Sequence, residues 1–162
     1  MKHSTIILLA RIFIIIFALV GLAVAILIPG HTPEQPCLTS PAGQVIEDVL
    51  LELCVVLCFA ILVIGWLLTS AIRNDTVFTK KTAGLFRIAA FLMLGDAVLY
   101  LVTNATRFFV GCLKEGQPFD VKAFLIRGVF FMVALVGSLV CGVMYQYLAK
   151  AAEIKEDNDS IV

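Results

Sequence analysis

The stretch VLLELCVVLCFAILVIGWLLTSAI, residues 49–72, decides the fold class, because Glu52 is its only charged residue. An α-helix rises about 1.5 Å per residue, so roughly 20 apolar residues cross the roughly 30 Å of hydrocarbon in a bilayer. Inside hydrocarbon every backbone N–H and C=O group must be satisfied within its own segment, as it is in a helix. The stretch therefore predicts a transmembrane helix.

Three more stretches of similar length and composition occur on either side of it, at about residues 6–29, 85–110 and 123–148. Polar connections rich in proline, glycine or basic residues separate them, at His31–Gln44, Arg73–Lys81 and Gly111–Asp120. The first stretch begins like a cleavable signal peptide, but its apolar run continues to Pro29, which favours a retained helix. We expect an all-α membrane protein, a four-transmembrane-helix bundle over residues 1–150 with an acidic tail over 151–162.

The composition points the same way and excludes several functions. Apolar residues make up 61% of the chain and charged residues 15%, with a mean hydropathy of +1.04, whereas soluble domains are about 45–50% apolar and about 25% charged. Twelve basic and twelve acidic residues give a net charge of +0, which predicts no direct binding of nucleic acid. Because no nucleophile–base pair, phosphate-binding loop or metal-ligand spacing occurs, we expect a non-enzymatic protein without cofactor or metal.

The distribution of basic residues predicts the orientation, since cytoplasmic loops carry an excess of lysine and arginine. Four basic residues fall on or near one side of the predicted membrane, at Arg107, Lys114, Lys122 and Arg127. Eight fall on the other side, at Lys2, Arg11, Arg73, Lys80, Lys81, Arg87, Lys150 and Lys155. Both termini are therefore expected in the cytoplasm.

Asp96 lies near the middle of the third predicted span, where a charged side chain is costly and is a functional hypothesis by default. Tyr100 follows one turn later on the same face. One interpretation is a proton- or cation-linked carboxylate, or a contact for a polar ligand. The alternative is a structural carboxyl group that is protonated or hydrogen-bonded, for example to Ser138 or to Arg11 of the first span.

Charged residues also gather at the outer boundary of the predicted bundle. They open the second span, close the third and lie one turn into the fourth, at Glu47, Asp48, Glu52, Arg107 and Arg127. Opposite charges at one depth should pair, so we expect an ion pair of Glu52 with Arg127 or Arg107. The alternative is an outward-facing pocket for a polar or peptidic ligand, lined by these residues and by Asn104.

Two cysteines, Cys37 and Cys112, lie one in each outward-facing loop, where thiols can be oxidised. They predict a disulfide, with two free thiols as the alternative. Cys54 and Cys58 share a helix face and are expected to pack as small buried side chains.

Small residues recur at helical spacing in the fourth span, at Ala134, Ser138 and Gly142, and in the first, at Gly21 and Ala25. Such residues let helix backbones approach closely. They predict packing within the chain, with a homodimer face as the alternative.

Two cytoplasmic stretches carry a family resemblance. Thr79 can cap a helix start with Phe78 against the membrane surface, and Lys80, Lys81 and Arg87 follow at headgroup level. The order of four spans, Phe78-Thr79 followed by Thr82 and Phe86-Arg87, and the tail Ile154–Asp159 resemble the bacterial membrane family called domain of unknown function 2975. That family usually ends with Asp-Leu-Thr followed by Val or Ile. Here Ser160-Ile161-Val162 follows Asp159, so the ending is partly kept.

The resemblance implies a partner as well as a location in the bacterial cytoplasmic membrane. Members are often encoded beside a small helix-turn-helix regulator, so the resemblance implies a membrane partner of a transcription factor and no catalytic residues. Acidic side chains of the tail could imitate DNA phosphates toward such a protein, or could simply keep the helix end in water. The expected partner-binding residues are Phe78, Lys80, Lys81, Arg87, Glu156, Asp157 and Asp159.

Three functional classes follow from these expectations. The first is a membrane regulator or sensor that holds a cytoplasmic helix-turn-helix regulator. The second is a small transporter or immunity-type protein that uses Asp96. The third is a thiol oxidoreductase, although the outer loops lack the second, resolving cysteine that a disulfide relay needs.

Overall fold

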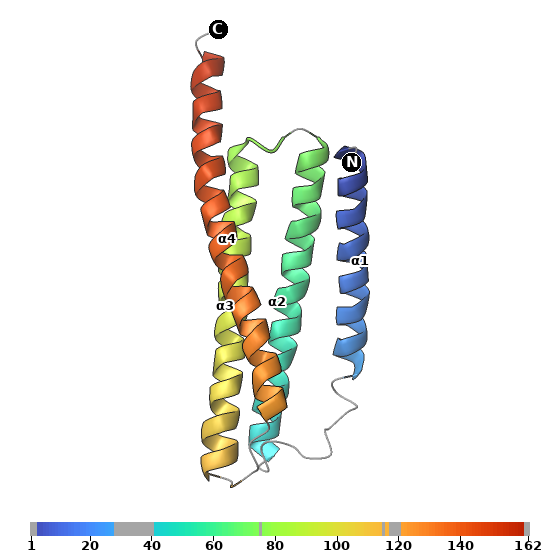
Figure 1. Cartoon of the computed structure of the whole chain (residues 1–162), viewed down its shortest axis with the longest axis vertical. Helices are drawn as coiled ribbons and strands as arrows, with labels where there is room; N and C mark the ends of the chain where they lie inside the picture. Colours follow the sequence, from blue (N-terminus) through green and yellow to red (C-terminus); the bar gives the residue numbers. More distant parts are fainter. Residues whose placement is uncertain (1–2, 28–40, 75, 115, 117–120, 161–162) are drawn as a thin grey trace.

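A computed structural model describes residues 3–27, 41–74, 76–114, 116 and 121–160, and it is all-helical apart from short connections in these residues (Figure 1). The helices in chain order are α1 (His3–Leu27), α2 (Pro41–Arg73), α3 (Lys80–Thr106), its π-helical continuation η2 (Arg107–Lys114) and α4 (Val121–Ser160). Four segments are long and apolar enough to cross a membrane: Thr5–Ala23, Asp48–Arg73, Lys80–Val110 and Phe124–Asn158. The prediction of four helices of this kind is confirmed.

Two helix boundaries differ from the expected ones. The second helix begins at Pro41, inside the expected loop, because proline lacks an N–H group that the first turn of a helix leaves unbonded anyway. The third continues through η2 to Lys114, so the first part of the expected outer loop is helical. Helix α4 runs on to Ser160, so most of the expected acidic tail is helical.

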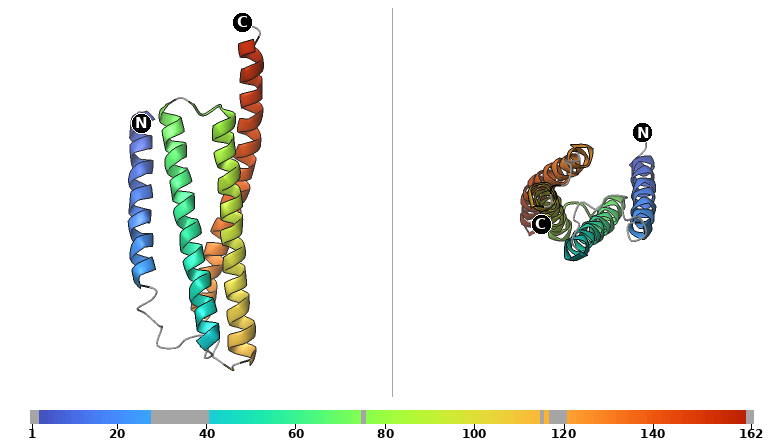
Figure 2. Two further views of the ribbon diagram at one scale, coloured as in Figure 1. Left: turned by 180° about the vertical axis from the view of Figure 1, so that it is seen from behind. Right: turned by 90° about the horizontal axis from the view of Figure 1, so that it is seen from below.

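The helices stand in a row. Helix α1 packs on α2, α2 on α3, and α3 on α4 along the most extensive of these contacts. The view along the helices in Figure 2 shows an open, curved row with α1 at one end. The described helices thus form an open row with α1 at one end and α4 at the other.

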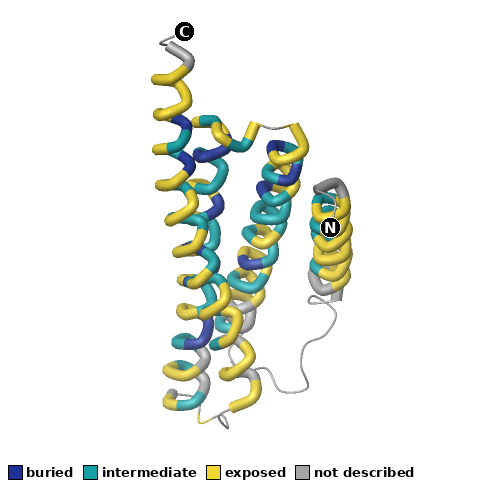
Figure 3. Tube along the Cα trace, turned by 45° about the horizontal axis from the view of Figure 1, so that its top comes forward, coloured by how far each residue is buried: buried dark blue, intermediate teal, exposed yellow. Residues whose placement is uncertain are grey.

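Apart from Ile64 and Leu148, the buried side chains are small or polar, and many of the large apolar ones are exposed. Buried positions include Cys54, Ala83, Ala97 and Thr103, whereas Phe17 is 61% exposed. Figure 3 shows the buried positions on the faces that α2, α3 and α4 turn to one another, and none of the described residues of α1 is buried. Small residues at contacts between helices and apolar residues outside are typical of helices packed within lipid.

Residues of both predicted small-residue stripes pack within the chain. The Ser138 hydroxyl of α4 donates to the Ala90 carbonyl oxygen of α3 at 2.8 Å. A Cβ atom added at Gly21 of α1 would lie 3.4 Å from the Phe59 ring of α2. A homodimer face remains a prediction.

Candidate functional site

A threonine network fixes the connection between α2 and α3. The Thr79 hydroxyl oxygen accepts the backbone N–H of Thr82 at 3.2 Å, which caps α3 as predicted. The Thr82 and Thr79 hydroxyls both donate to the Thr76 carbonyl oxygen, at 2.8 and 3.0 Å. Because Thr82 is only 4% exposed, these bonds hold a buried part of the turn.

The two stretches that carry the family resemblance lie against each other, one at the start of α3 and one near the end of α4. Lys80 Nζ forms an ion pair with Glu156 Oε2 at 2.6 Å. The Arg87 guanidinium lies 5.8 Å from the centre of the Tyr145 ring of α4, a cation–π arrangement. A cavity of about 310 Å³ between these residues is lined also by Glu153. We call the turns of α4 over residues 150–158, together with the start of α3, the α3–α4 end.

The other expected partner-binding residues are also at this end of the molecule. Phe78 is 55% exposed, Lys81 and Asp157 are exposed, and the side chain of Asp159 lies outside the described residues. Lys81 borders a second cavity, of about 410 Å³, together with the threonines of the turn. Ile154, which the sequence analysis did not single out as a partner contact, is 63% exposed among charged neighbours.

Arg11 binds α2 and does not reach Asp96, in contrast to one of the predicted alternatives. Its Nη2 donates to Ser70 Oγ at 2.9 Å, its Nε to Thr69 Oγ1 at 3.4 Å, and its guanidinium lies 4.6 Å from the centre of the Trp66 ring. Arg11 cannot reach Asp96 of α3 because α1 packs on α2, and α2 lies between α1 and α3.

Asp96 faces thiol groups of α2. The carboxyl group is 4% exposed, and Cys58 Sγ donates to its Oδ2 at 3.7 Å. Its Oδ1 has no hydrogen-bond partner among the described residues. The predicted bond to Ser138 is wrong, because Ser138 donates to the α3 backbone. Tyr100 stacks on the Phe130 ring at 5.7 Å between ring centres.

Only part of the predicted outer charge cluster can be placed. Asp48 and Glu52 are exposed on α2, whereas the side chains of Glu47, Arg107 and Arg127 lie outside the described residues. The expected ion pairs therefore stay predictions. Asn104 is 9% exposed, and its Oδ1 has no hydrogen-bond partner in the described part of the chain.

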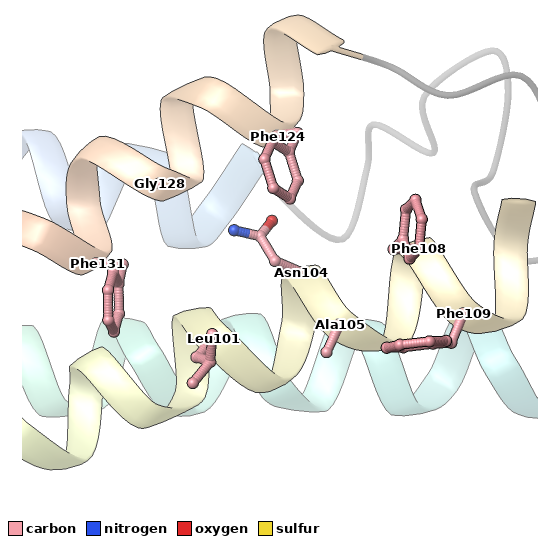
Figure 4. Close-up of a pocket in the computed structure, with 8 residues that line it drawn as sticks. All are labelled: Leu101, Asn104, Ala105, Phe108, Phe109, Phe124, Gly128 and Phe131. Atoms are coloured by element: carbon pink, nitrogen blue, oxygen red, sulfur yellow. The ribbon is translucent and has the colours of Figure 1, made fainter.

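Asn104 borders a cavity of about 360 Å³ between α3, η2 and α4. Figure 4 shows its carboxamide pointing from α3 toward α4, with phenyl rings around it. Four of the lining residues are Phe108, Phe109, Phe124 and Phe131, and the others are Leu101, Ala105 and Gly128. Asn104 was expected to border an outward-facing pocket lined by charged residues. The cavity that it borders is instead mostly aromatic among its described lining residues. The sequence feature that could have indicated this cavity is the group of phenylalanines that follows Asn104 along the chain.

The predicted disulfide between Cys37 and Cys112 is not supported. Cys112 is a free, half-buried thiol, and Cys37 lies outside the described residues. Cys112 belongs to the η2 helix and not to a loop. A loop cysteine can approach a partner more freely than one fixed in a helix, because disulfides require a narrow range of Cα distances.

A family profile described as Protein of unknown function (DUF2975) matches residues 48–162. The chain belongs to this family. The match begins inside α2 and leaves α1 outside it. No curated protein and no solved structure matches the chain.

Within the DUF2975 match, the short motifs that carried the resemblance have separate physical roles. Thr79 and Thr82 build the turn and cap α3, and Arg87 joins α3 to α4. Phe78 and the last turns of α4 remain exposed at the same end. The motifs thus combine a hydrogen-bonded turn with an exposed surface.

Proposed function

We propose that this protein is a non-enzymatic, multi-pass protein of the bacterial cytoplasmic membrane that holds a small helix-turn-helix regulator on its α3–α4 end. In this proposal four helices cross the lipid bilayer, both termini lie in the cytoplasm, and the bound regulator is kept from DNA.

The exposed apolar surface supports the membrane part of the proposal. Side chains such as Phe13, Leu125 and Val133 are 59–65% exposed along their helices. Water would be in contact with a far larger apolar area than soluble proteins expose, whereas lipid chains suit it. The start of α1 and the end of α4 lie toward the same end of the molecule as the basic start of α3 (Figure 1), and an excess of basic residues supports a cytoplasmic position for that end.

The observation that carries the partner-binding proposal is the projection of α4. In Figure 1 the last turns of α4 extend past the ends of the other helices. Ile154 is 63% exposed there, and the exposed side chains of Glu153, Glu156 and Asp157 surround it in the sequence. An exposed apolar contact beside three acidic side chains, with Lys155 as its basic neighbour, suits the basic, DNA-reading face of a helix-turn-helix domain.

Regulator binding can be measured with the purified full-length protein in detergent and the regulator encoded beside it. We expect the double substitution Glu153→Lys with Ile154→Ser to weaken binding at least tenfold, because it reverses a charge and removes an exposed apolar contact. Asp48→Lys is the matched control, since it reverses an exposed charge at the far end of α2. Failure of the intact protein to retain the regulator, or undiminished binding after deletion of residues 151–162, would contradict the proposal.

Asp96 supports a second candidate, a small transporter or immunity-type protein. The observation that favours it is a buried carboxyl group with one oxygen unpaired among the described residues, as a proton- or cation-linked site requires. Uptake, efflux and resistance in cells that carry Asp96→Asn, compared with cells that carry Asp48→Asn, test it. Unchanged phenotypes for Asp96→Asn would remove this candidate.

A further inference from the structure

The cavity beside Asn104 contains an unmet hydrogen-bond acceptor in apolar surroundings. Asn104 Oδ1 is buried and has no partner among the described residues, and Asn104 supplies the only polar side chain among the eight lining residues. A buried carbonyl oxygen without a donor is costly. A ligand that brings one N–H or O–H group into the cavity would remove that cost.

The residues that line the cavity limit the size and the chemistry of the rest of the ligand. Phe108 and Phe109 come from η2, and Phe124 and Phe131 from α4, so phenyl rings border the space from both sides (Figure 4). Aromatic rings in contact gain more than their apolar area alone gives, through edge-to-face and offset stacking. At about 360 Å³, the cavity is at the small end of ligand sites, which suits one ring system with a substituent.

The position of the cavity also fits an amphipathic ligand from the bilayer. Asn104 is 24 residues beyond Lys80, about 36 Å along the helix, which in the proposed orientation is close to the outer headgroups. Phe109 and Phe124 are 62% and 43% exposed, so the rim of the cavity borders lipid. A ring with a hydroxyl group favours this boundary, as the side chain of tyrosine does.

We infer that the cavity between α3, η2 and α4 binds a lipophilic phenol, an aromatic ring with one hydroxyl group and a hydrocarbon substituent, whose hydroxyl donates to Asn104 Oδ1. A lipid acyl chain would leave Asn104 Oδ1 unpaired, and a quinone offers only oxygens that accept. A phenol with a single hydroxyl meets the one polar side chain among the described lining residues without placing a second polar group among phenyl rings.

Gly128 provides a way to block the cavity without disturbing the fold. It lies on the same face of α4 as Phe124 and Phe131, at spacings of four and three residues. A Cβ atom added at Gly128 would meet no heavy atom within 4 Å, and the same is true of Gly142. Gly142 lies two heptads farther along α4 and does not line the cavity. Gly128→Leu and Gly142→Leu are therefore a matched pair.

The test uses 4-hexylphenol and its methyl ether, which has the same ring and chain but no donor, with the purified full-length protein in detergent. Native mass spectrometry counts the bound molecules and gives the dissociation constants. We expect one phenol per chain, bound about tenfold more tightly than the ether, since a donor that satisfies a buried acceptor is worth about that factor. We expect Asn104→Leu to abolish the preference, Gly128→Leu to abolish binding of both compounds, and Gly142→Leu to change neither.

Two results would overturn the inference. Equal affinity for the phenol and the ether in the natural protein would show that Asn104 contributes no acceptor, and undiminished binding in Gly128→Leu would place the compounds elsewhere. An alkylated quinol tests the source of the ligand. Binding weaker than that of the phenol supports a ligand with one hydroxyl group, and equal binding would contradict the single hydroxyl group of the proposal. Because no regulator is present, the outcome is independent of the proposed partner.

Discussion

Buried polar groups are hydrogen-bonded at the start of α3, whereas the middle and the far part of α3 carry buried oxygens without a partner among the described residues. At the α3–α4 end, buried Thr82 donates to Thr76, and Arg11 of α1 binds two hydroxyl groups of α2 close by in the row. Farther along α3, the two buried side-chain oxygens that lack a partner among the described residues belong to Asp96 and Asn104. The turn before α3 thus has paired buried groups, whereas the later part of α3 has two buried oxygens without a partner among the described residues.

The largest effect on stability is expected from Thr82→Val. The change keeps the shape of the side chain but removes the 2.8 Å hydrogen bond to the Thr76 carbonyl oxygen, which keeps the Thr79 hydroxyl as its donor, so we expect a loss of about 1.5 kcal/mol in the free energy of unfolding. Thermal unfolding in detergent measures it. Thr103→Val is the control, because the Thr103 hydroxyl donates to Leu99 within its own helix and that carbonyl can keep its helical bond. An equal loss in both variants would contradict a fixed support at the turn.

Asn104→Leu should have a smaller effect of opposite sign. It replaces a buried amide whose oxygen has no partner in the described part of the chain by an apolar side chain of similar size, so we expect a gain of about 1 kcal/mol. The same unfolding assay, without added ligand, measures this gain. A loss similar to that of Thr82→Val would show that Asn104 is already satisfied and would remove the contrast between the two ends.

The smallest effect is expected from Lys80→Gln. Both partners of the ion pair with Glu156 are more than half exposed, at 65% and 58%, and exposed ion pairs contribute little to stability. We expect an unfolding temperature within error of the natural protein, in low as well as in high salt. A clear salt-dependent decrease would mean that the ion pair, and not the threonine turn, holds the α3–α4 end together.

The sequence was sufficient for features that depend on local order along the chain. The four long apolar helices, the Thr79 cap and the extension of α4 all follow from neighbouring residues. The partners of Arg11 and Ser138 did not follow, because large apolar residues surround each helix and no polar face shows which neighbours it has. The cavity was missed for the same reason, since its residues come from α3, η2 and α4.

The arrangement of the helices in a row has a consequence for transport. A water-filled pathway through a membrane needs walls on every side, and the described helices stand in a row with two open flanks. A single copy would leave a solute beside Asp96 in contact with lipid on at least one flank. Conduction would therefore require several copies around a common axis, whereas a platform for a cytoplasmic partner needs only one.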